Sequence, residues 1–325
     1  MFLLVGARAG VAQQEKLAQV GMKFLNVSVD PRAVALGNAY TAVEGESSML
    51  FYNPASMAWQ NDGFSVALSH TGWIADVDYE SASMSFRPGS GGMGVFWFSF
   101  VFVDYGSLEE TIRFDNDDGF IDLGTFSPQS WSFGAGYAKA FTDRFSVGGQ
   151  VKYAKQDLGS SVVSIVGEGD YTRTANSEGV VAFDFGMFYK TGFKSLNFAV
   201  SARNFSQEIS YAEESFQLPL TLRIGLAMDV MDLMGSRPES QSLLVTIDAE
   251  NPRDFSETVN LGTEYLFANT LALRAGYRFP TDQEGISLGV GLKQALGNVG
   301  FGADYSFTSF GVFSSVHRLA IKFSL

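Results

Sequence analysis

The 325-residue chain has no cysteine and only two histidines, His70 and His317. The missing cysteine excludes disulfides, thiol nucleophiles and cysteine metal sites, and so few histidines argue against a histidine-rich catalytic metal centre. Basic residues are scarce as well, because 22 lysines and arginines oppose 35 aspartates and glutamates, for a net charge of -13. A nucleic-acid-binding protein needs a basic face to neutralise phosphates, so this balance argues against that class.

Long apolar runs are also missing. The N-terminal stretch, residues 2–12, is interrupted by Arg8 and falls short of the ~20 residues that a helix needs to cross a bilayer. It looks instead like an export signal, with small residues at Gly10 and Ala12 before a cleavage site, although a basic start is missing. We expect a signal peptide over residues 1–12, and the alternative is a cytoplasmic N-terminus.

What the chain does have is glycine, phenylalanine and, from Gly63 onward, a period of two. In residues 145–154, apolar side chains such as Val147 and Val151 share one face, while Gln150 and Lys152 share the other. Such alternation is typical of a strand with one apolar face. It recurs in nine further segments between residues 181 and 325, and no Asp, Glu, Lys or Arg occurs on any of the apolar faces.

This segregation favours a membrane barrel, because an Arg or Lys on a lipid-facing strand position costs roughly 2–4 kcal/mol at the bilayer midplane. A soluble sandwich alternates too, so the number of strands and the loop lengths must decide. Four earlier segments, 64–72, 79–87, 93–104 and 130–140, bring the predicted strands to fourteen. Connections after odd strands are long and those after even strands are short, apart from residues 230–240. We therefore predict an all-β, antiparallel transmembrane barrel of about fourteen strands over residues 63–325, in outer-membrane lipid.

The segment before the barrel, residues 13–62, does not alternate. Asp30 and Asn53, each followed directly by a proline, are typical helix N-caps, and Gly37 would close the first helix. About fifty residues do not make a reliable independent domain, whereas a large barrel has an interior wider than its own side chains fill. We predict that this segment enters the lumen as a plug or hatch, and the alternative is a periplasmic tail.

Residues 23–59, KFLNVSVDPRAVALGNAYTAVEGESSMLFYNPASMAW, resemble the N-terminal signature of the PorV/PorQ family of outer-membrane proteins. The Asn-Pro-Ala triplet is also shared with FadL-type fatty-acid channels, which are fourteen-stranded barrels with an N-terminal hatch. The closing residues, HRLAIKFSL, resemble a barrel-assembly signal, although Leu325 stands where an aromatic residue is usual. The plug motif that this resemblance marks consists of Arg32, Gly37, Asn53, Pro54 and Ala55.

The resemblance implies two alternative functions. PorV and PorQ imply a non-enzymatic role in type IX secretion or surface attachment, with the C-terminal domains of secreted proteins or other secretion components as partners. FadL implies a channel for uptake of long-chain fatty acids or other hydrophobic small molecules. An enzyme is disfavoured because the sequence shows no inward-facing set of Ser, His and Asp, and no cofactor is expected. The acidic run 115–118 lacks the spacing of an EF-hand loop, so a solvated loop is favoured over a metal site.

Two sets of side chains are predicted to face the lumen. In residues 93–103 both strand faces are apolar, and if Val95 and Trp97 face lipid, the opposite face either packs on the plug or lines an apolar ligand site. That opposite face consists of Phe96, Phe98, Phe100 and Phe102. The second set is a charge ladder on neighbouring strands ~4.8 Å apart, which either pairs and tightens the wall or lines a path for a polar solute. It consists of Asp248, Glu250, Glu264, Arg274, Arg278, Lys293, Asp304 and Arg318.

Overall fold

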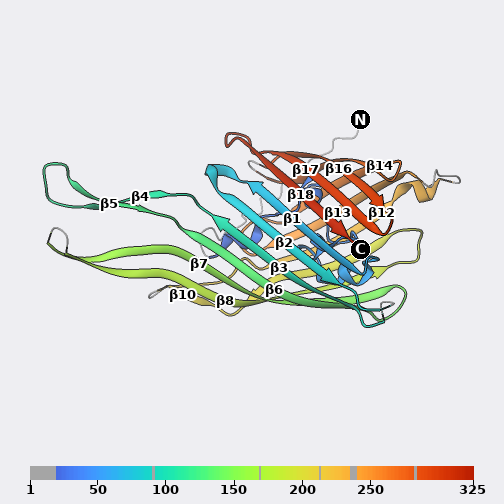
Figure 1. The fold of residues 1–325 in the computed structure, drawn as a ribbon, viewed down its shortest axis with the longest axis horizontal. Helices are drawn as coiled ribbons and strands as arrows, with labels where there is room; N and C mark the ends of the chain where they lie inside the picture. The colour runs from blue at the N-terminus through green and yellow to red at the C-terminus, as the bar shows by residue number, and fades with distance from the viewer. Residues whose placement is uncertain (1–19, 90–91, 168–169, 212–213, 235–239, 282–283) are drawn as a thin grey trace, which may run out of the picture.

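The computed structural model describes residues 20–89, 92–167, 170–211, 214–234, 240–281 and 284–325. Its main feature is a closed, fully antiparallel barrel of fourteen strands, as predicted (Figure 1). Strand β18 pairs with β1 and closes the barrel. The barrel strands are β1 (Phe64–Gly72), β2 (Asp78–Phe86), β3 (Val95–Asp104), β6 (Gln129–Ala140), β7 (Phe145–Gly167), β8 (Asp170–Lys190), β9 (Asn197–Ser206), β12 (Thr221–Asp229), β13 (Ser242–Pro252), β14 (Thr258–Phe267), β15 (Leu271–Phe279), β16 (Ile286–Leu296), β17 (Val299–Ser309) and β18 (Ser315–Ser324).

The two faces of the strands separate as the alternation predicts. On β12, Leu222 and Ile224 are 48% and 51% exposed, whereas Arg223 between them is buried. Apolar side chains are exposed in the same way on the other barrel strands. Since this outer surface is apolar and the inward surface polar, the barrel is suited to contact with lipid. Among the described residues, the helices are too short and too polar to cross a membrane.

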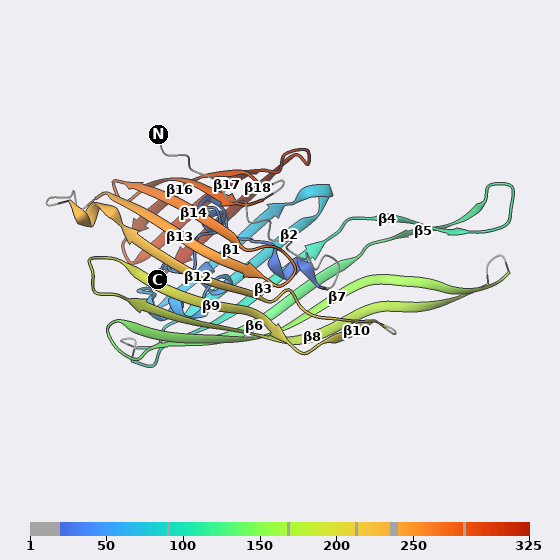
Figure 2. The ribbon, with the colours of Figure 1, turned by 180° about the vertical axis from the view of Figure 1, so that it is seen from behind.

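The two ends of the barrel differ in the length of their connections. At the long-loop end, β7 and β8 continue past their neighbours, because pairing with β6 ends at Asp157 and pairing with β9 begins at Ala182. Residues 158–167 and 170–181 therefore form a projecting ribbon, where the sequence predicts a loop. A second hairpin projects at the same end (Figures 1 and 2). The hairpins here are β4–β5 (Leu108–Arg113 and Phe120–Phe126) and β10–β11 (Ile209–Tyr211 and Glu214–Phe216), and the β1–β2 connection holds the short helix η4 (Ile74–Asp76).

The opposite, short-turn end carries the tight connections after even-numbered barrel strands, together with Leu325. The longer connection predicted there over 230–240 contains η5 (Val230–Leu233). The predicted alternation is therefore present in part: the connections from β3 to β6 and from β9 to β12 at the long-loop end are long and those from β14 to β15 and from β16 to β17 at the short-turn end are short, whereas the connection from β12 to β13 departs from it.

The N-terminal segment, residues 20–62, runs along the inward side of the strands from the long-loop end, where Val20 bridges Gln217, to the start of β1. The predicted N-caps are present: the Asp30 carboxylate accepts the Ala33 N–H at 2.9 Å, and the Asn53 side chain accepts the Ala55 N–H at 3.0 Å. The second helix is a 3-10 helix. The segment contains η1 (Lys23–Asn26), α1 (Pro31–Ala35), η2 (Ser47–Phe51) and η3 (Pro54–Trp59).

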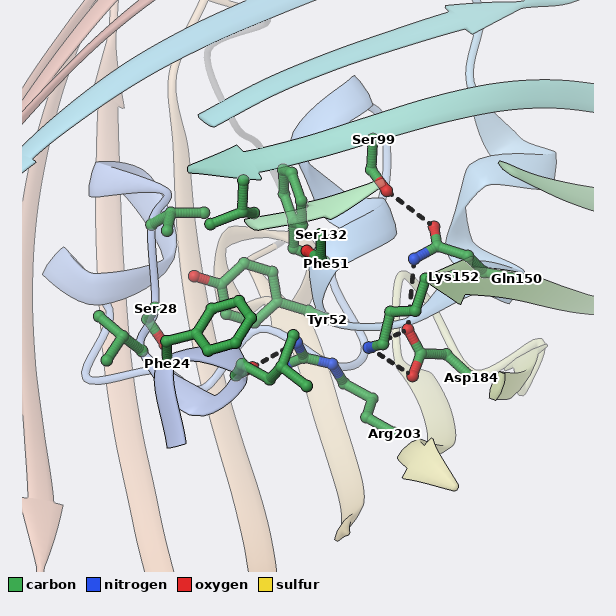
Figure 3. Close-up of a pocket in the computed structure, with 14 residues that line it drawn as sticks. Phe24, Ser28, Phe51, Tyr52, Ser99, Ser132, Gln150, Lys152, Asp184 and Arg203 are labelled. Carbon is green, nitrogen blue, oxygen red and sulfur yellow. Dashed lines mark hydrogen bonds and ion pairs between the residues drawn. The ribbon is translucent and has the colours of Figure 1, made fainter. Parts of the chain in front are cut away.

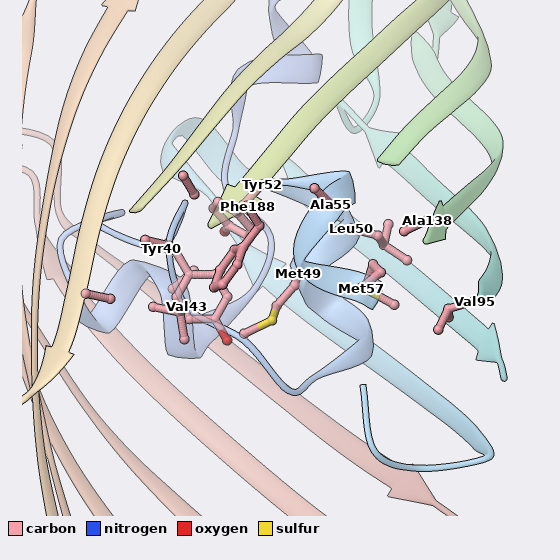
Figure 4. Packing of buried hydrophobic residues seen from close by; sticks show 14 of the residues in the cluster. Tyr40, Val43, Met49, Leu50, Tyr52, Ala55, Met57, Val95, Ala138 and Phe188 are labelled. Carbon is pink, nitrogen blue, oxygen red and sulfur yellow. The ribbon is translucent and has the colours of Figure 1, made fainter. Parts of the chain in front are cut away.

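The hydrophobic core lies between this segment and the barrel wall (Figure 4). Tyr40, Met49 and Leu50 from the segment are at most 1% exposed and belong to one cluster with Trp97 and Phe188 of the wall. The N-terminal residues thus pack against the inner wall of the barrel, while the apolar side chains on the outer face of the strands remain exposed.

The predicted direction of the β3 phenylalanines is wrong. Phe96, Phe98 and Phe100 are 40–46% exposed on the outer face, and Phe102 shares their side of the strand, whereas Trp97 is buried in the core. The physical reason is that β3 meets the apolar part of the N-terminal segment on its inner side, so both faces are apolar. The Trp97 indole N–H also finds an inward acceptor, the Gln150 side-chain oxygen at 2.8 Å.

Candidate functional site

The predicted charge ladder is a buried network of ion pairs on the inward faces of β13–β18. Arg274, whose side chain is 0% exposed, lies 2.5 Å from a carboxylate oxygen of Glu264 and 2.5 Å from one of Asp304. Glu264 and Arg274 are direct partners in the β14–β15 register. Opposite charges on adjacent strands thus pair, as the interpretation of the ladder as a wall-tightening structure predicts. Because positive and negative side chains alternate, their fields cancel, and no net field favours the passage of an ion.

The N-terminal segment is part of this network. Arg32, from the predicted plug motif, lies 2.6 Å from Glu264 and 2.8 Å from Glu46. Glu46 also pairs with Lys293 at 2.9 Å and Lys322 at 2.5 Å. Burial alone would raise the pKa of the Glu46 carboxyl, but the three surrounding cations hold it well below its usual range. Sequence reasoning missed Glu46, which lies in a short polar break and gives no periodic signal.

Other ladder residues bind the segment or each other. Asp248 accepts the backbone N–H groups of Tyr40 at 3.0 Å and Thr41 at 2.9 Å. Glu250 pairs with Arg223 at 3.0 Å and with Arg278 at 3.2 Å. Wall and segment are therefore joined by charge-assisted hydrogen bonds over much of the lumen.

The rest of the plug motif fits the wall by close backbone approach. The Asn53 side chain donates to the Met187 carbonyl of β8 at 3.3 Å, and Ser146 of β7 donates to the Ala55 carbonyl at 2.9 Å. Gly37 has φ +64°, and a methyl group there would lie 2.7 Å from the Leu261 carbonyl oxygen. Gly37 is therefore required both by its left-handed backbone and by its contact with the wall.

Gly276 faces Gly37 across this contact, and a methyl group on it would overlap the Gly37 backbone nitrogen. We expect Gly276→Ala to loosen the segment and to accelerate amide hydrogen exchange over residues 31–44 by about tenfold or more, because overpacking against backbone costs ~1–3 kcal/mol. Gly149→Ala is the matched control, since a methyl group there meets its nearest atom at 3.5 Å. Equal exchange in both variants would mean that the segment does not rest on the wall at this point.

Several cavities lie between the segment and the barrel wall. An enclosed pocket between the segment and β7–β9, in which Lys152 lies 2.8 Å from Asp184, has a volume of only about 30 Å³ (Figure 3). This is room on the scale of one water molecule. A cavity of about 630 Å³ beside Glu46 and Lys322 opens at the short-turn end, and one of about 680 Å³ beside Trp73 and Arg318 opens at the long-loop end. The described residues form no cluster of His, Cys, Asp and Glu that could hold a metal ion.

Comparison with known protein families finds a match for residues 122–323, to the family described as "Type IX secretion system membrane protein PorP/SprF". The chain belongs to the PorP/SprF family. The type IX part of the predicted resemblance is thereby confirmed, whereas the specific assignment to PorV or PorQ is not. No curated protein matches this PorP/SprF-family chain.

Among solved structures, the barrel is similar to hydrocarbon transporters. The toluene transporter TodX of Pseudomonas putida is 15% identical, with a TM-score of 0.57 over 90% of this chain and 97% of TodX. The toluene transporter TbuX of Ralstonia pickettii is 13% identical, with a TM-score of 0.56 over 91% of this chain and 97% of TbuX. The monoaromatic hydrocarbon channel CymD is 13% identical, with a TM-score of 0.55 over 92% of this chain and 98% of CymD. The TM-scores show that this chain shares its fold with these barrels, and at such low identities the likeness shows nothing about transport.

Proposed function

We propose that this PorP/SprF-family barrel resides in the outer membrane and serves protein secretion or surface attachment by the type IX system as a non-enzymatic component. The family match over residues 122–323 carries this proposal. The apolar outer face suits a lipid bilayer, and the projecting loops suit an orientation with the long-loop end outside. The signal peptide predicted over 1–12 lies outside the described residues and stays a prediction.

We propose further that residues 20–62 act as a plug. The segment is held by buried ion pairs such as Arg32–Glu264 and by Glu46, whose three cations come from the segment and two barrel strands. We expect a lumen filled in this way to block the passage of ions, so that the barrel is closed at rest.

A conductance measurement tests the plug. In planar bilayers we expect the wild-type protein to stay closed, and Glu46→Gln to raise the open fraction by about tenfold or more, the equivalent of ~1.4 kcal/mol, because Arg32, Lys293 and Lys322 lose their shared counter-charge. Glu44→Gln is the matched control, since Glu44 belongs to the same segment but forms a half-exposed pair with Lys190. A wild-type protein with a stable open conductance would exclude a plug.

The second candidate function is a channel for hydrophobic molecules. It is favoured by the cavity at the long-loop end, whose wall includes Trp73, Tyr79 and Phe310. Against it, the predicted apolar lining of Phe96, Phe98, Phe100 and Phe102 lies on the outer face of the barrel, and the lumen below the cavity is charged. We therefore place secretion first.

Copurification from native membranes in mild detergent separates the two functions. We expect the protein to retain secretion components or the C-terminal domains of exported proteins, identified by mass spectrometry of cross-linked complexes. Bound lipids and hydrocarbons are extracted from the same sample and measured separately. Recovery of fatty acid or hydrocarbon with no protein partner would overturn the secretion proposal and favour the channel.

A further inference from the structure

The cavity at the long-loop end has the walls of a ligand site. Its volume of about 680 Å³ falls within the ~300–1,000 Å³ that is usual for ligand pockets. Trp73 lines it and makes edge-to-face contacts with Phe310 at 5.1 Å and with Tyr79 at 6.2 Å between ring centroids. Such rings offer a flat apolar surface to an aromatic or aliphatic side chain.

Arg318 lines this cavity as a buried cation that forms no ion pair with any described residue. Its side chain is 2% exposed, its guanidinium lies 5.3 Å from the Trp73 ring, and it donates to the Ser28 carbonyl at 2.9 Å and to the Thr308 hydroxyl at 3.4 Å. Within the described part of the chain, it has no carboxylate within 4.0 Å, whereas Arg274 has two. The predicted charge ladder therefore does not include Arg318 as a paired member.

The other charges around the cavity neutralise one another. Lys23 pairs with Asp254 at 3.1 Å, and Arg278 pairs with Glu284 at 2.8 Å. Among the described lining residues, Lys23 and Arg278 therefore each have a carboxylate partner, and Arg278 has a second one in Glu250 at 3.2 Å, whereas Arg318 has none within 4.0 Å. Because a buried charge without a counter-ion is strongly unfavourable, an anionic ligand would be stabilised here.

We propose that this cavity binds a short polypeptide segment that carries a carboxylate next to an aromatic or apolar side chain. The carboxylate pairs with Arg318, and the aromatic or apolar side chain packs on Trp73. The inference rests on the proposed secretion function, because an exported polypeptide is the ligand that this location would meet. The carboxylate belongs either to the chain end or to an acidic side chain.

The test is isothermal titration of the full-length protein in lipid nanodiscs at pH 7. The probe is an N-acetylated tetrapeptide, Ala-Gly-Ala-Phe, with a free C-terminal carboxylate. It is compared with its C-terminal amide and with an amidated Ala-Gly-Asp-Phe. We expect the free acid to bind at least about tenfold more tightly than the amide, as the loss of one charged hydrogen-bonding pair predicts. Rescue by the aspartate peptide would assign the carboxylate to an acidic side chain, and no rescue would assign it to the chain end.

Variants locate the binding. In Arg318→Gln the acid and the amide should bind equally, while Arg173→Gln on the exposed ribbon should keep the full difference. Trp73→Leu, in the connection after β1, should weaken both peptides alike, and it decides the matter if Arg318→Gln does not assemble. Equal binding of acid and amide to the wild type would overturn the inference, as would binding of toluene without any peptide binding.

The secretion proposal is tested separately by secretion in cells. If a deletion strain loses type IX cargo secretion and the purified protein does not distinguish acid from amide, only the peptide site is wrong. If the peptide site behaves as expected and the deletion strain secretes normally, only the secretion role is wrong.

Discussion

Replacing Arg274 with methionine is expected to lower the free energy of unfolding of the barrel by about 3–5 kcal/mol. The guanidinium of Arg274 is fully buried and is shared by Glu264 and Asp304, each at 2.5 Å. Its removal leaves two carboxylates close together in the lumen, each with one cation fewer. The measurement is urea unfolding of the protein in lipid vesicles, followed by tryptophan fluorescence.

The matched control is Arg144→Met. Arg144 is 54% exposed and lies 3.8 Å from Asp143 in a short turn, so its loss should change stability by less than about 1 kcal/mol. If Arg274→Met were as stable as Arg144→Met, the lumen would be hydrated well enough to screen its charges. The account of a tightly packed, ion-paired interior would then be incorrect.

Ile224→Arg is expected to impair insertion of the barrel by roughly 2–4 kcal/mol. Ile224 lies near the middle of β12 and is 51% exposed on the outer face. A guanidinium at that place meets the hydrocarbon centre of the bilayer rather than water. The measurement is the yield of heat-modifiable, folded protein in membranes, together with folding into vesicles.

The control variant is Val312→Arg, which also replaces an aliphatic residue by arginine, but at a position that we expect to lie outside the bilayer. Val312 is 84% exposed in the connection between β17 and β18, so this variant should assemble as the wild type does. Normal assembly of both variants would show that the outer face of β12 is not in lipid. Failure of both would point to a general intolerance of arginine.

The strands and their inward faces could be predicted because lipid and lumen impose opposite demands on alternate residues. At Ile224 and Arg223 this contrast is complete, and the structure places both as predicted. On β3 the contrast vanishes, since Phe96 and Trp97 are both apolar. The direction of that strand depends on packing against residues some fifty positions earlier, which no local pattern reports.

The buried ion-pair network could be predicted only in part from the sequence. Residues of the ladder such as Glu264 stood out because they are charged positions on periodic strands, and their strand order indicated that opposite signs could meet. Glu46 lies outside any strand and contacts Lys322, 276 positions away, so its role as the shared anion depends on the path of the N-terminal segment. Arg318 lies on a periodic strand like the paired ladder residues, and only the three-dimensional structure shows that none of the described carboxylates lies within 4.0 Å of it.

The long-loop end shows a different limit. Residues 158–165 and 171–179 lack a clear apolar face, because side chains on both sides of the ribbon are exposed or half-buried, and the sequence therefore predicts a loop. Backbone pairing between β7 and β8 extends the barrel hairpin all the same. Alternation detects strands through the environment that they face, so it fails where both faces meet water.

The most direct test of the central claim is a deletion of the gene in its native host, with two quantities measured in the same cells. One is the amount of type IX cargo released or attached at the surface, and the other is the uptake of a labelled fatty acid and of toluene. We predict that cargo secretion is lost and is restored by the wild-type gene, while uptake is unchanged. Normal secretion together with lost uptake would contradict the claim and identify the barrel as a channel for hydrophobic molecules.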